Sequence, residues 1–212
     1  MGRLHVLTDE TVQSRWTHVA IARAAAAGGA DVVQYREKRR VPEGVRQETA
    51  REIVETLAAT QVRCIVNDDV DSALAAGASG VHLGPDDACP EDVRRRWPGA
   101  LLGATANDVD RALICDALPI DYLGVGPVYG TRSKASPAPA LGLAELERIV
   151  RAVECPVIAI GSIDATNIGP VLRTGVWGVA VLGAVACHDD PCAATRELRA
   201  ILDAWRDRNV TA

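Results

Sequence analysis

The stretch of this chain most suggestive of chemistry is Val33-Gln34-Tyr35-Arg36-Glu37-Lys38, where apolar residues give way abruptly to polar and charged ones. A buried strand does not carry unpaired charge through its middle, because burying such charge is costly. These side chains must therefore stand where a strand leaves the core. Two spaced cations and an amide at such a place can bind pyrophosphate or a similar oxyanion. The alternative is a solvated loop start with a chance cluster of charges.

The composition predicts a globular chain with a substantial core. The 212 residues are 48% hydrophobic and 24% charged, and they include no Phe and one Met, so small aliphatic side chains must fill the core. A net charge of −5 argues against a nucleic-acid-binding surface, and a local cluster must then hold any anionic ligand. Six scattered cysteines without a C-x-x-C pair argue against a cysteine metal site or a disulfide framework.

No membrane segment is expected in this sequence. Arg3, His5 and Asp9 interrupt any apolar start, so we predict no signal peptide. The longest apolar run, 176–187, is too short and too rich in Gly to cross a bilayer. We therefore expect a cytoplasmic protein that acts on small molecules, without nucleic-acid or membrane partners. A homo-oligomer is compatible with the sequence.

Short β-type runs alternate with amphipathic stretches along the whole chain. Expected strands cover 3–7, 30–35, 63–66, 80–83, 101–104, 121–125, 156–160 and 178–182, and helical spacing follows them, as in 45–59, 143–153 and 193–205. Three similar phrases, at 27–31, 76–80 and 174–178, place Gly at a helix end just before a strand. Eight such units predict an α/β fold, a single-domain (β/α)8 TIM barrel over 1–212. A doubly wound open sheet is the alternative.

In a barrel the chemistry lies where the strands end, on the carboxyl-terminal face. Acids follow the third and fourth expected strands, at Asp68, Asp69, Asp86 and Asp87. Acids at adjacent strand ends can hold a divalent cation, and Mg²⁺ typically uses one or two carboxylates together with phosphate oxygens of a substrate. A helix N-cap is the alternative for Asp68 or Asp69, and a solvated turn is the preferred interpretation of Asp86. A histidine within an apolar run, His82, is more often a satisfied core residue.

Three further segments are candidates for phosphate binding. Gly161-Ser162 and Leu182-Gly183 end the last two strands, where barrels often bind phosphate through backbone N–H groups. The long loop 129–141 is rich in Gly, Ser, Thr, Pro and Lys, which is typical of binding loops and lids. Tight-turn glycines are the alternative for the first two segments.

Taken together, these residues resemble the thiamine-phosphate synthase family over nearly the whole chain. The order and spacing of seven short pieces make the resemblance specific. They are Gln34–Lys38, Val66-Asn67-Asp68, Gly80–Gly84 with Asp87, Gly124–Tyr129, Thr131-Arg132-Ser133-Lys134, Leu141-Gly142-Leu143 and Ile158–Gly161. Enzymes of that family are (β/α)8 barrels that join a hydroxymethylpyrimidine pyrophosphate to a thiazole phosphate and release pyrophosphate.

The resemblance implies a role for each matching residue. It implies pyrophosphate contacts from Gln34, Arg36, Lys38, Asn67 and Lys134, with the three cations as catalytic residues, and Mg²⁺ on Asp68 and Asp87. It implies that the thiazole phosphate lies near Thr131, Ser133, Gly161, Leu182 and Gly183, and the pyrimidine near Thr105. Arg132 is either catalytic or merely exposed. Strand parity predicts that Tyr35 and Glu37 support packing and loop structure.

The chain departs from the family pattern at a few positions. Pro85 stands where Gln is usual, Ser162 replaces a usual Gly and Gly183 a usual Ser, and Thr105 and Asn107 lie where Ser and a following His are usual. Because that His is absent and the pyrophosphate set is present, a synthase is preferred over the sister thiazole tautomerase. Less favoured are a paralogue with a different heteroaromatic substrate, a non-catalytic sensor of a thiamine precursor and a phosphate-sugar epimerase. The epimerase lacks a suitably placed acid–base pair.

Overall fold

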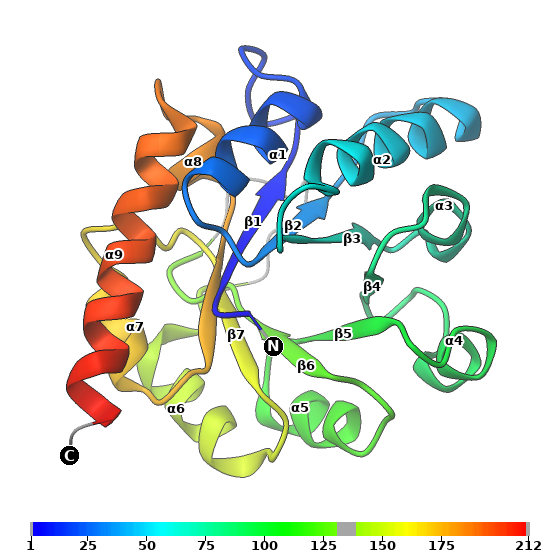
Figure 1. Cartoon of the computed structure of the whole chain (residues 1–212). Helices are drawn as coiled ribbons and strands as arrows, with labels where there is room; N and C mark the ends of the chain where they lie inside the picture. The colour runs from blue at the N-terminus through cyan, green and yellow to red at the C-terminus, as the bar shows by residue number, and fades with distance from the viewer. Residues whose placement is uncertain (1, 131–138, 211–212) are drawn as a thin grey trace.

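Eight parallel strands close into a barrel in the order of the sequence, with β1 paired to β8 (Figure 1). The computed structural model describes residues 2–130 and 139–210. The strands are β1 (Leu4–Thr8), β2 (Val32–Tyr35), β3 (Arg63–Asn67), β4 (Gly80–Leu83), β5 (Leu101–Ala106), β6 (Tyr122–Val125), β7 (Val157–Ile160) and β8 (Gly178–Val181). The predicted (β/α)8 barrel is confirmed, and the open sheet is excluded because β1 and β8 are hydrogen-bonded neighbours.

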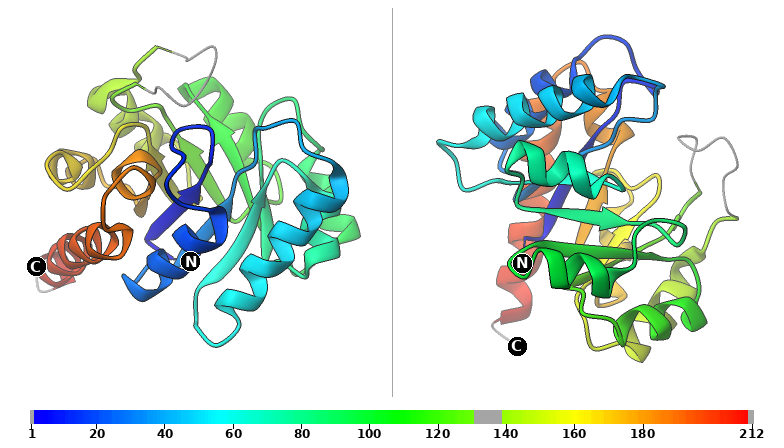
Figure 2. Two further views of the ribbon diagram at one scale, coloured as in Figure 1. Left: turned by 90° about the horizontal axis from the view of Figure 1, so that it is seen from above. Right: turned by 90° about the vertical axis from the view of Figure 1, so that its right-hand side faces the viewer.

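Helices follow the strands and cover the outside of the barrel (Figures 1 and 2). They are α1 (His18–Ala27), α2 (Glu43–Leu57), α3 (Val70–Ala76), α4 (Pro90–Arg96), α5 (Val109–Asp116), α6 (Gly142–Ala152), α7 (Ile168–Arg173), α8 (Gly183–Ala186) and α9 (Pro191–Val210). The predicted Gly-containing loops follow α1, α3 and α7. Gly29, Gly77 and Gly175 have φ values of 93°, 68° and 88°, a backbone conformation that favours glycine. None of the described helices is both long and apolar enough to cross a membrane.

β3 and β5 are longer than the sequence predicts, and β2 begins two residues later than expected. β3 extends to Asn67 and β5 to Ala106, so Thr105 lies within a strand rather than after it. β2 begins at Val32 rather than at residue 30, because the Ala30 N–H donates to the Ala25 carbonyl oxygen and closes the end of α1. Register pairs Asn67 with His82 on β4, and Thr105 with Gly124 on β6.

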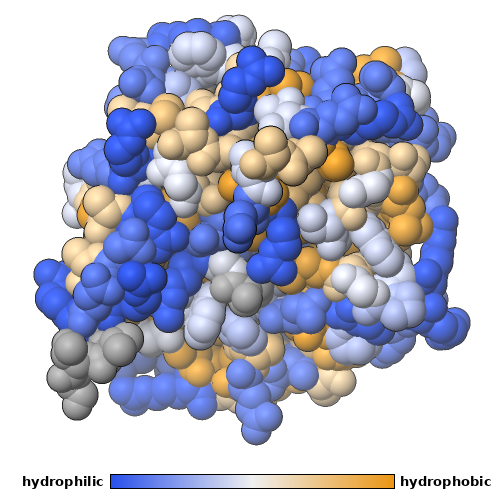
Figure 3. Space-filling model, viewed as in Figure 1, coloured by the Kyte–Doolittle hydropathy of each residue, from blue (hydrophilic) through white to orange (hydrophobic). Residues whose placement is uncertain are grey.

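The side chains of each strand alternate between the barrel interior and the surrounding helices. The buried hydrophobic residues form two clusters, and the larger one packs the outer faces of the strands against the helices. A smaller cluster fills the barrel with Leu7, Val32, Ile65, Leu101, Tyr122, Ile158 and Ala180. Tyr122 is the bulkiest member of the inner cluster. The face seen in Figure 3 carries hydrophilic side chains over most of its area, with smaller apolar patches between them.

His5 lies in this interior and should make stability depend on pH. It is 1% exposed, its Nε2 has no hydrogen-bond partner among the described residues, and burial lowers its pKa to about 4. Between pH 6.5 and 4 the unfolded chain therefore binds a proton that the folded chain does not. Stability is lost as the pH falls, by about 1 kcal/mol from this group between pH 7.5 and 5.5.

Urea unfolding at these two pH values measures the effect. His5→Gln should lose less stability on acidification than the wild type, whereas a control substitution of the exposed His188 by Gln should keep the wild-type dependence. Equal losses in all three proteins would contradict the assignment to His5.

Candidate active site

A buried ion pair joins the carboxyl ends of β1 and β2. The Arg36 N–H donates to the Thr8 carbonyl oxygen over 3.2 Å, which extends the pairing of the two strands by one residue. The Arg36 guanidinium contacts the Asp9 carboxylate, and the two residues are 7% and 0% exposed. Asp9 thus fixes the guanidinium at the strand end. Sequence reasoning gives Asp9 no role, although its place directly after the first strand, beside an Arg after the second, is the signal that could have identified it.

Lys38, Asp68 and Asp87 form a charged cluster next to this pair. Lys38 Nζ lies 2.5 Å from Asp68 Oδ2, and the Asp68 and Asp87 carboxyl groups lie close enough to interact electrostatically. Asp87 also accepts the Gly84 N–H over 2.6 Å. Partial burial and the neighbouring Asp68 raise the pKa of Asp87 above its usual value. The structure therefore brings together one cation and two acids that the sequence assigned to one site.

The two neighbouring acids, Asp69 and Asp86, have other environments. Asp69 caps α3 by accepting the Ser72 N–H over 2.9 Å, and it also pairs with Arg46. Asp86 lies in an exposed turn, as the sequence predicted. Asp68 has φ 66°, a left-handed conformation that Asp adopts more readily than most residues. Because of this conformation at residue 68, the Asp68 side chain contacts Lys38, whereas the Asp69 side chain caps α3.

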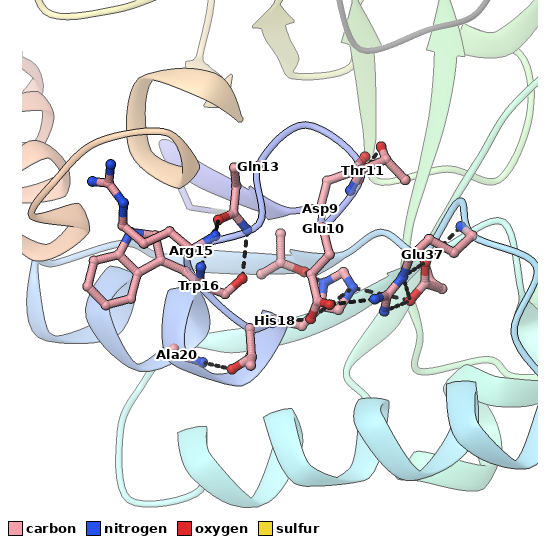
Figure 4. A network of polar contacts seen from close by, with 12 residues as sticks. Asp9, Glu10, Thr11, Gln13, Arg15, Trp16, His18, Ala20 and Glu37 are labelled. Carbon is pink, nitrogen blue, oxygen red and sulfur yellow. Dashed lines mark hydrogen bonds and ion pairs between the residues drawn. The ribbon is translucent and has the colours of Figure 1, made fainter.

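A second network of polar contacts joins the segment after β2 to helix α1 (Figure 4). His18, on α1, is hydrogen-bonded to Thr8 Oγ1 over 2.8 Å and to Glu37 over 3.3 Å. Burial opposes ionisation of Glu37, yet hydrogen bonds from Arg39 hold its pKa at about 2. Tyr35 is 2% exposed and packs edge-on against the His18 ring. The prediction that Tyr35 and Glu37 support packing and loop structure is confirmed.

Gln34, Asn67 and Thr105 lie on inward-facing rows of the barrel. Gln34 aligns with Leu7 and Ile65, both members of the inner cluster. Asn67 ends the next strand, two residues beyond Ile65. Thr105 is half-buried and hydrogen-bonded to His82 Nε2 over 2.9 Å. His82 is thus a satisfied residue, as predicted, but its partners include a candidate substrate contact.

Glycine geometry brings the end of β7 close to the segment after β6. Gly161 has φ 116°, and a Cβ on it would lie 2.5 Å from Pro127 Cα, so a larger residue would force the segments apart. Ser162 follows with φ 49°, and its hydroxyl donates to the Gly130 carbonyl oxygen over 3.0 Å. Leu182 immediately precedes α8, which starts at Gly183. The remaining candidates, Thr131, Arg132, Ser133 and Lys134, lie outside the described residues.

Comparisons with known proteins point to one family. Residues 4–185 match the family described as thiamine monophosphate synthase. A thiamine-phosphate synthase of Methanoculleus marisnigri is 44% identical over 92% of this chain and 93% of its own length, and one of Chloroflexus aurantiacus is 41% identical over 97% and 95%. The solved structure of a thiamine phosphate pyrophosphorylase from Pyrococcus furiosus superposes with a TM-score of 0.87 at 36% identity, over 96% of both chains.

Proposed function

This chain belongs to the thiamine monophosphate synthase family, and we propose that it is a transferase joining a hydroxymethylpyrimidine pyrophosphate to a thiazole phosphate. The products are thiamine phosphate and pyrophosphate. The observation that carries the proposal is the cluster of Arg36, Lys38, Asp68 and Asp87 on adjacent strand ends. It supplies cations for a leaving pyrophosphate and carboxylates for a metal ion beside it.

The chemistry divides into bond breaking and bond making. The bond from the pyrimidine methylene carbon to the pyrophosphate oxygen breaks, and its electron pair leaves with that oxygen. The electron-rich pyrimidine stabilises the resulting cation, and the lone pair of the thiazole nitrogen then forms the new C–N bond. No strong general base is required. The protein has to position both partners, neutralise the leaving group and exclude water.

The residues named above divide this work between them. Arg36, held by Asp9, and Lys38 neutralise the pyrophosphate, while Gln34 and Asn67 orient it from the barrel interior. Lys134 adds a third cation. Thr105 contacts the pyrimidine. Backbone groups at Gly161, Leu182 and Gly183 bind the thiazole phosphate together with Thr131 and Ser133, as helix and strand ends do at many phosphate sites.

We further propose that Asp68 and Asp87 hold Mg²⁺ in the complex with substrate. Within 2–130 and 139–210, no three His, Cys, Asp or Glu side chains gather as a ready-made metal site. The two neighbouring carboxyl groups nevertheless fit Mg²⁺, which commonly takes one or two carboxylates and completes its shell with water and phosphate oxygens. When bound, the ion would stabilise negative charge on the departing pyrophosphate.

A tautomerase and a sensor have less support than the synthase. The stretch after Thr105 contains Asn107 and Asp108 in place of the histidine that a thiazole tautomerase uses, and Asp108 caps α5 by accepting the Arg111 N–H. A sensor that only binds a thiamine precursor has little use for cations and acids around a leaving group. We also propose a cytoplasmic location, which the six free cysteines support.

Purified protein with the pyrimidine pyrophosphate, the thiazole phosphate and Mg²⁺ should form thiamine phosphate and release pyrophosphate in equal amounts. Coupled detection of pyrophosphate and fluorescence of oxidised thiamine phosphate measure the two products independently. Tight binding of either substrate with no product would instead favour the sensor.

A further inference from the structure

Two stacked rings lie next to Thr105 in the barrel interior, and two glycines make room for them. Tyr122, on β6, is 1% exposed and stacks on the His82 ring from β4, with centroids 5.4 Å apart. A Cβ on Gly103 would lie 2.1 Å from Tyr122 Cζ, and a Cβ on Gly124 would lie 2.7 Å from His82 Cε1. The absence of side chains at these two positions lets the rings fit within the barrel.

The rings connect the barrel interior to Thr105 through two hydrogen bonds. Tyr122 Oη lies 3.0 Å from His82 Nδ1, and His82 Nε2 lies 2.9 Å from Thr105 Oγ1. Burial raises the pKa of Tyr122 far above its usual value, so the phenol keeps its hydrogen. Among the described residues, Nδ1 of His82 is the hydrogen-bond partner of that hydroxyl.

This arrangement gives the chain of hydrogen bonds a direction. A buried hydroxyl hydrogen without an acceptor is costly, so the Tyr122 O–H donates to Nδ1. A neutral imidazole that accepts at one nitrogen carries its hydrogen on the other, so His82 Nε2–H donates to Thr105 Oγ1. The hydrogen of the half-buried Thr105 hydroxyl is then available to a ligand. In the opposite tautomer, with the hydrogen on Nδ1, the Thr105 hydroxyl would instead donate its hydrogen to His82 Nε2.

We propose that Tyr122 and His82 are positioning residues that hold the Thr105 hydroxyl as a hydrogen-bond donor to an unprotonated ring nitrogen of the substrate. This inference rests on the proposed function, in which Thr105 contacts the pyrimidine. The proposal implies a specificity rule for the substrate ring. A ring that carries C–H or N–H in place of the accepting nitrogen leaves the Thr105 hydroxyl without an acceptor and should therefore bind more weakly. The two rings act through Thr105 and touch no reacting atom.

The tautomer of His82 can be measured without substrate. Long-range ¹H–¹⁵N correlation spectra of the ¹⁵N-histidine-labelled full chain at pH 7.5 should give His82 as Nε2–H with unprotonated Nδ1, with the signal assigned by its loss in His82→Asn. Tyr122→Phe should shift it toward a mixture of tautomers. A wild-type Nδ1–H tautomer would overturn the proposal, even if the protein forms thiamine phosphate. Conversely, a protein with the expected tautomer and no product would refute the proposed function but not the hydrogen-bond direction.

Kinetics then test whether the rings act through Thr105. Tyr122→Phe and Thr105→Val should each raise KM for the pyrimidine pyrophosphate about 3- to 10-fold, as for one lost neutral hydrogen bond, and leave KM for the thiazole phosphate unchanged. Thr105→Ser keeps the hydroxyl and should have the wild-type KM for the pyrimidine pyrophosphate. The double variant Tyr122→Phe with Thr105→Val should have the same KM as Thr105→Val alone. Tyr35→Phe removes the hydroxyl of another buried tyrosine, on the helix-facing side of β2, and should change neither KM. Multiplicative effects in the double variant, or equal changes in both KM values, would overturn the positioning role.

Discussion

Replacing Arg36 by alanine is expected to lower the free energy of unfolding by about 3–5 kcal/mol and kcat/KM by more than about 100-fold. The first effect follows because Asp9 is 0% exposed and would become a buried carboxylate without its ion-pair partner. The second follows because Arg36 neutralises the leaving pyrophosphate. Urea unfolding and steady-state kinetics measure the two effects separately.

A double variant distinguishes these two roles of Arg36. Asp9→Asn with Arg36→Ala removes the unpaired charge and keeps an acceptor for the Thr11 N–H, which Asp9 binds over 2.7 Å. Stability should recover largely, while kcat/KM should stay low. Recovery of activity along with stability would mean that Arg36 serves only to neutralise Asp9. Arg95→Ala breaks an exposed pair with Asp92 and serves as the control, with an expected cost of at most about 1 kcal/mol.

Asp87→Asn is expected to lower kcat/KM by about 100-fold or more at fixed Mg²⁺ and to raise the Mg²⁺ concentration needed for half-maximal rate. The amide removes one anionic ligand but keeps similar size. Asp68→Asn should act in the same direction, and Asn tolerates the left-handed backbone that residue 68 adopts, with φ 66°. Initial rates across a Mg²⁺ titration give both kcat/KM and the Mg²⁺ concentration for half-maximal rate.

Each of these acids has a neighbouring aspartate as its matched control. Asp86→Asn changes an exposed turn residue and should leave the Mg²⁺ requirement unchanged. Asp69→Asn keeps a side-chain acceptor for the cap of α3 and removes the charge that pairs with Arg46, so it should cost at most about 1 kcal/mol of stability and leave Mg²⁺ use unchanged. If Asp86→Asn and Asp87→Asn gave the same titration curve, the metal site would have to lie elsewhere.

Much of the fold was predictable because its determinants are local. The eight strands are short, mainly apolar runs, and three of them follow a similar Gly-containing loop; the positive φ angles of Gly29, Gly77 and Gly175 are the backbone requirement behind that repeated phrase. The class of chemistry was predictable for a related reason. A charged residue such as Arg36 or Asp68 directly after an apolar run can only stand at a strand end, and parallel strands gather their ends on one face.

The sequence by itself determined the barrel, the end of the barrel that carries the chemistry and the residue types gathered there. Only the tertiary structure decided which of two adjacent aspartates joins Lys38, because the turn after β3 sends Asp68 to the site and Asp69 to a helix cap. It likewise decided that Asp9 holds Arg36 and that Tyr122 reaches Thr105 through His82. In the sequence, Asp9 and Arg36 are 27 residues apart, His82 and Tyr122 are 40 apart, and His82 and Thr105 are 23 apart. Local alternation sets which face a side chain takes, but barrel closure and strand register set what it meets there.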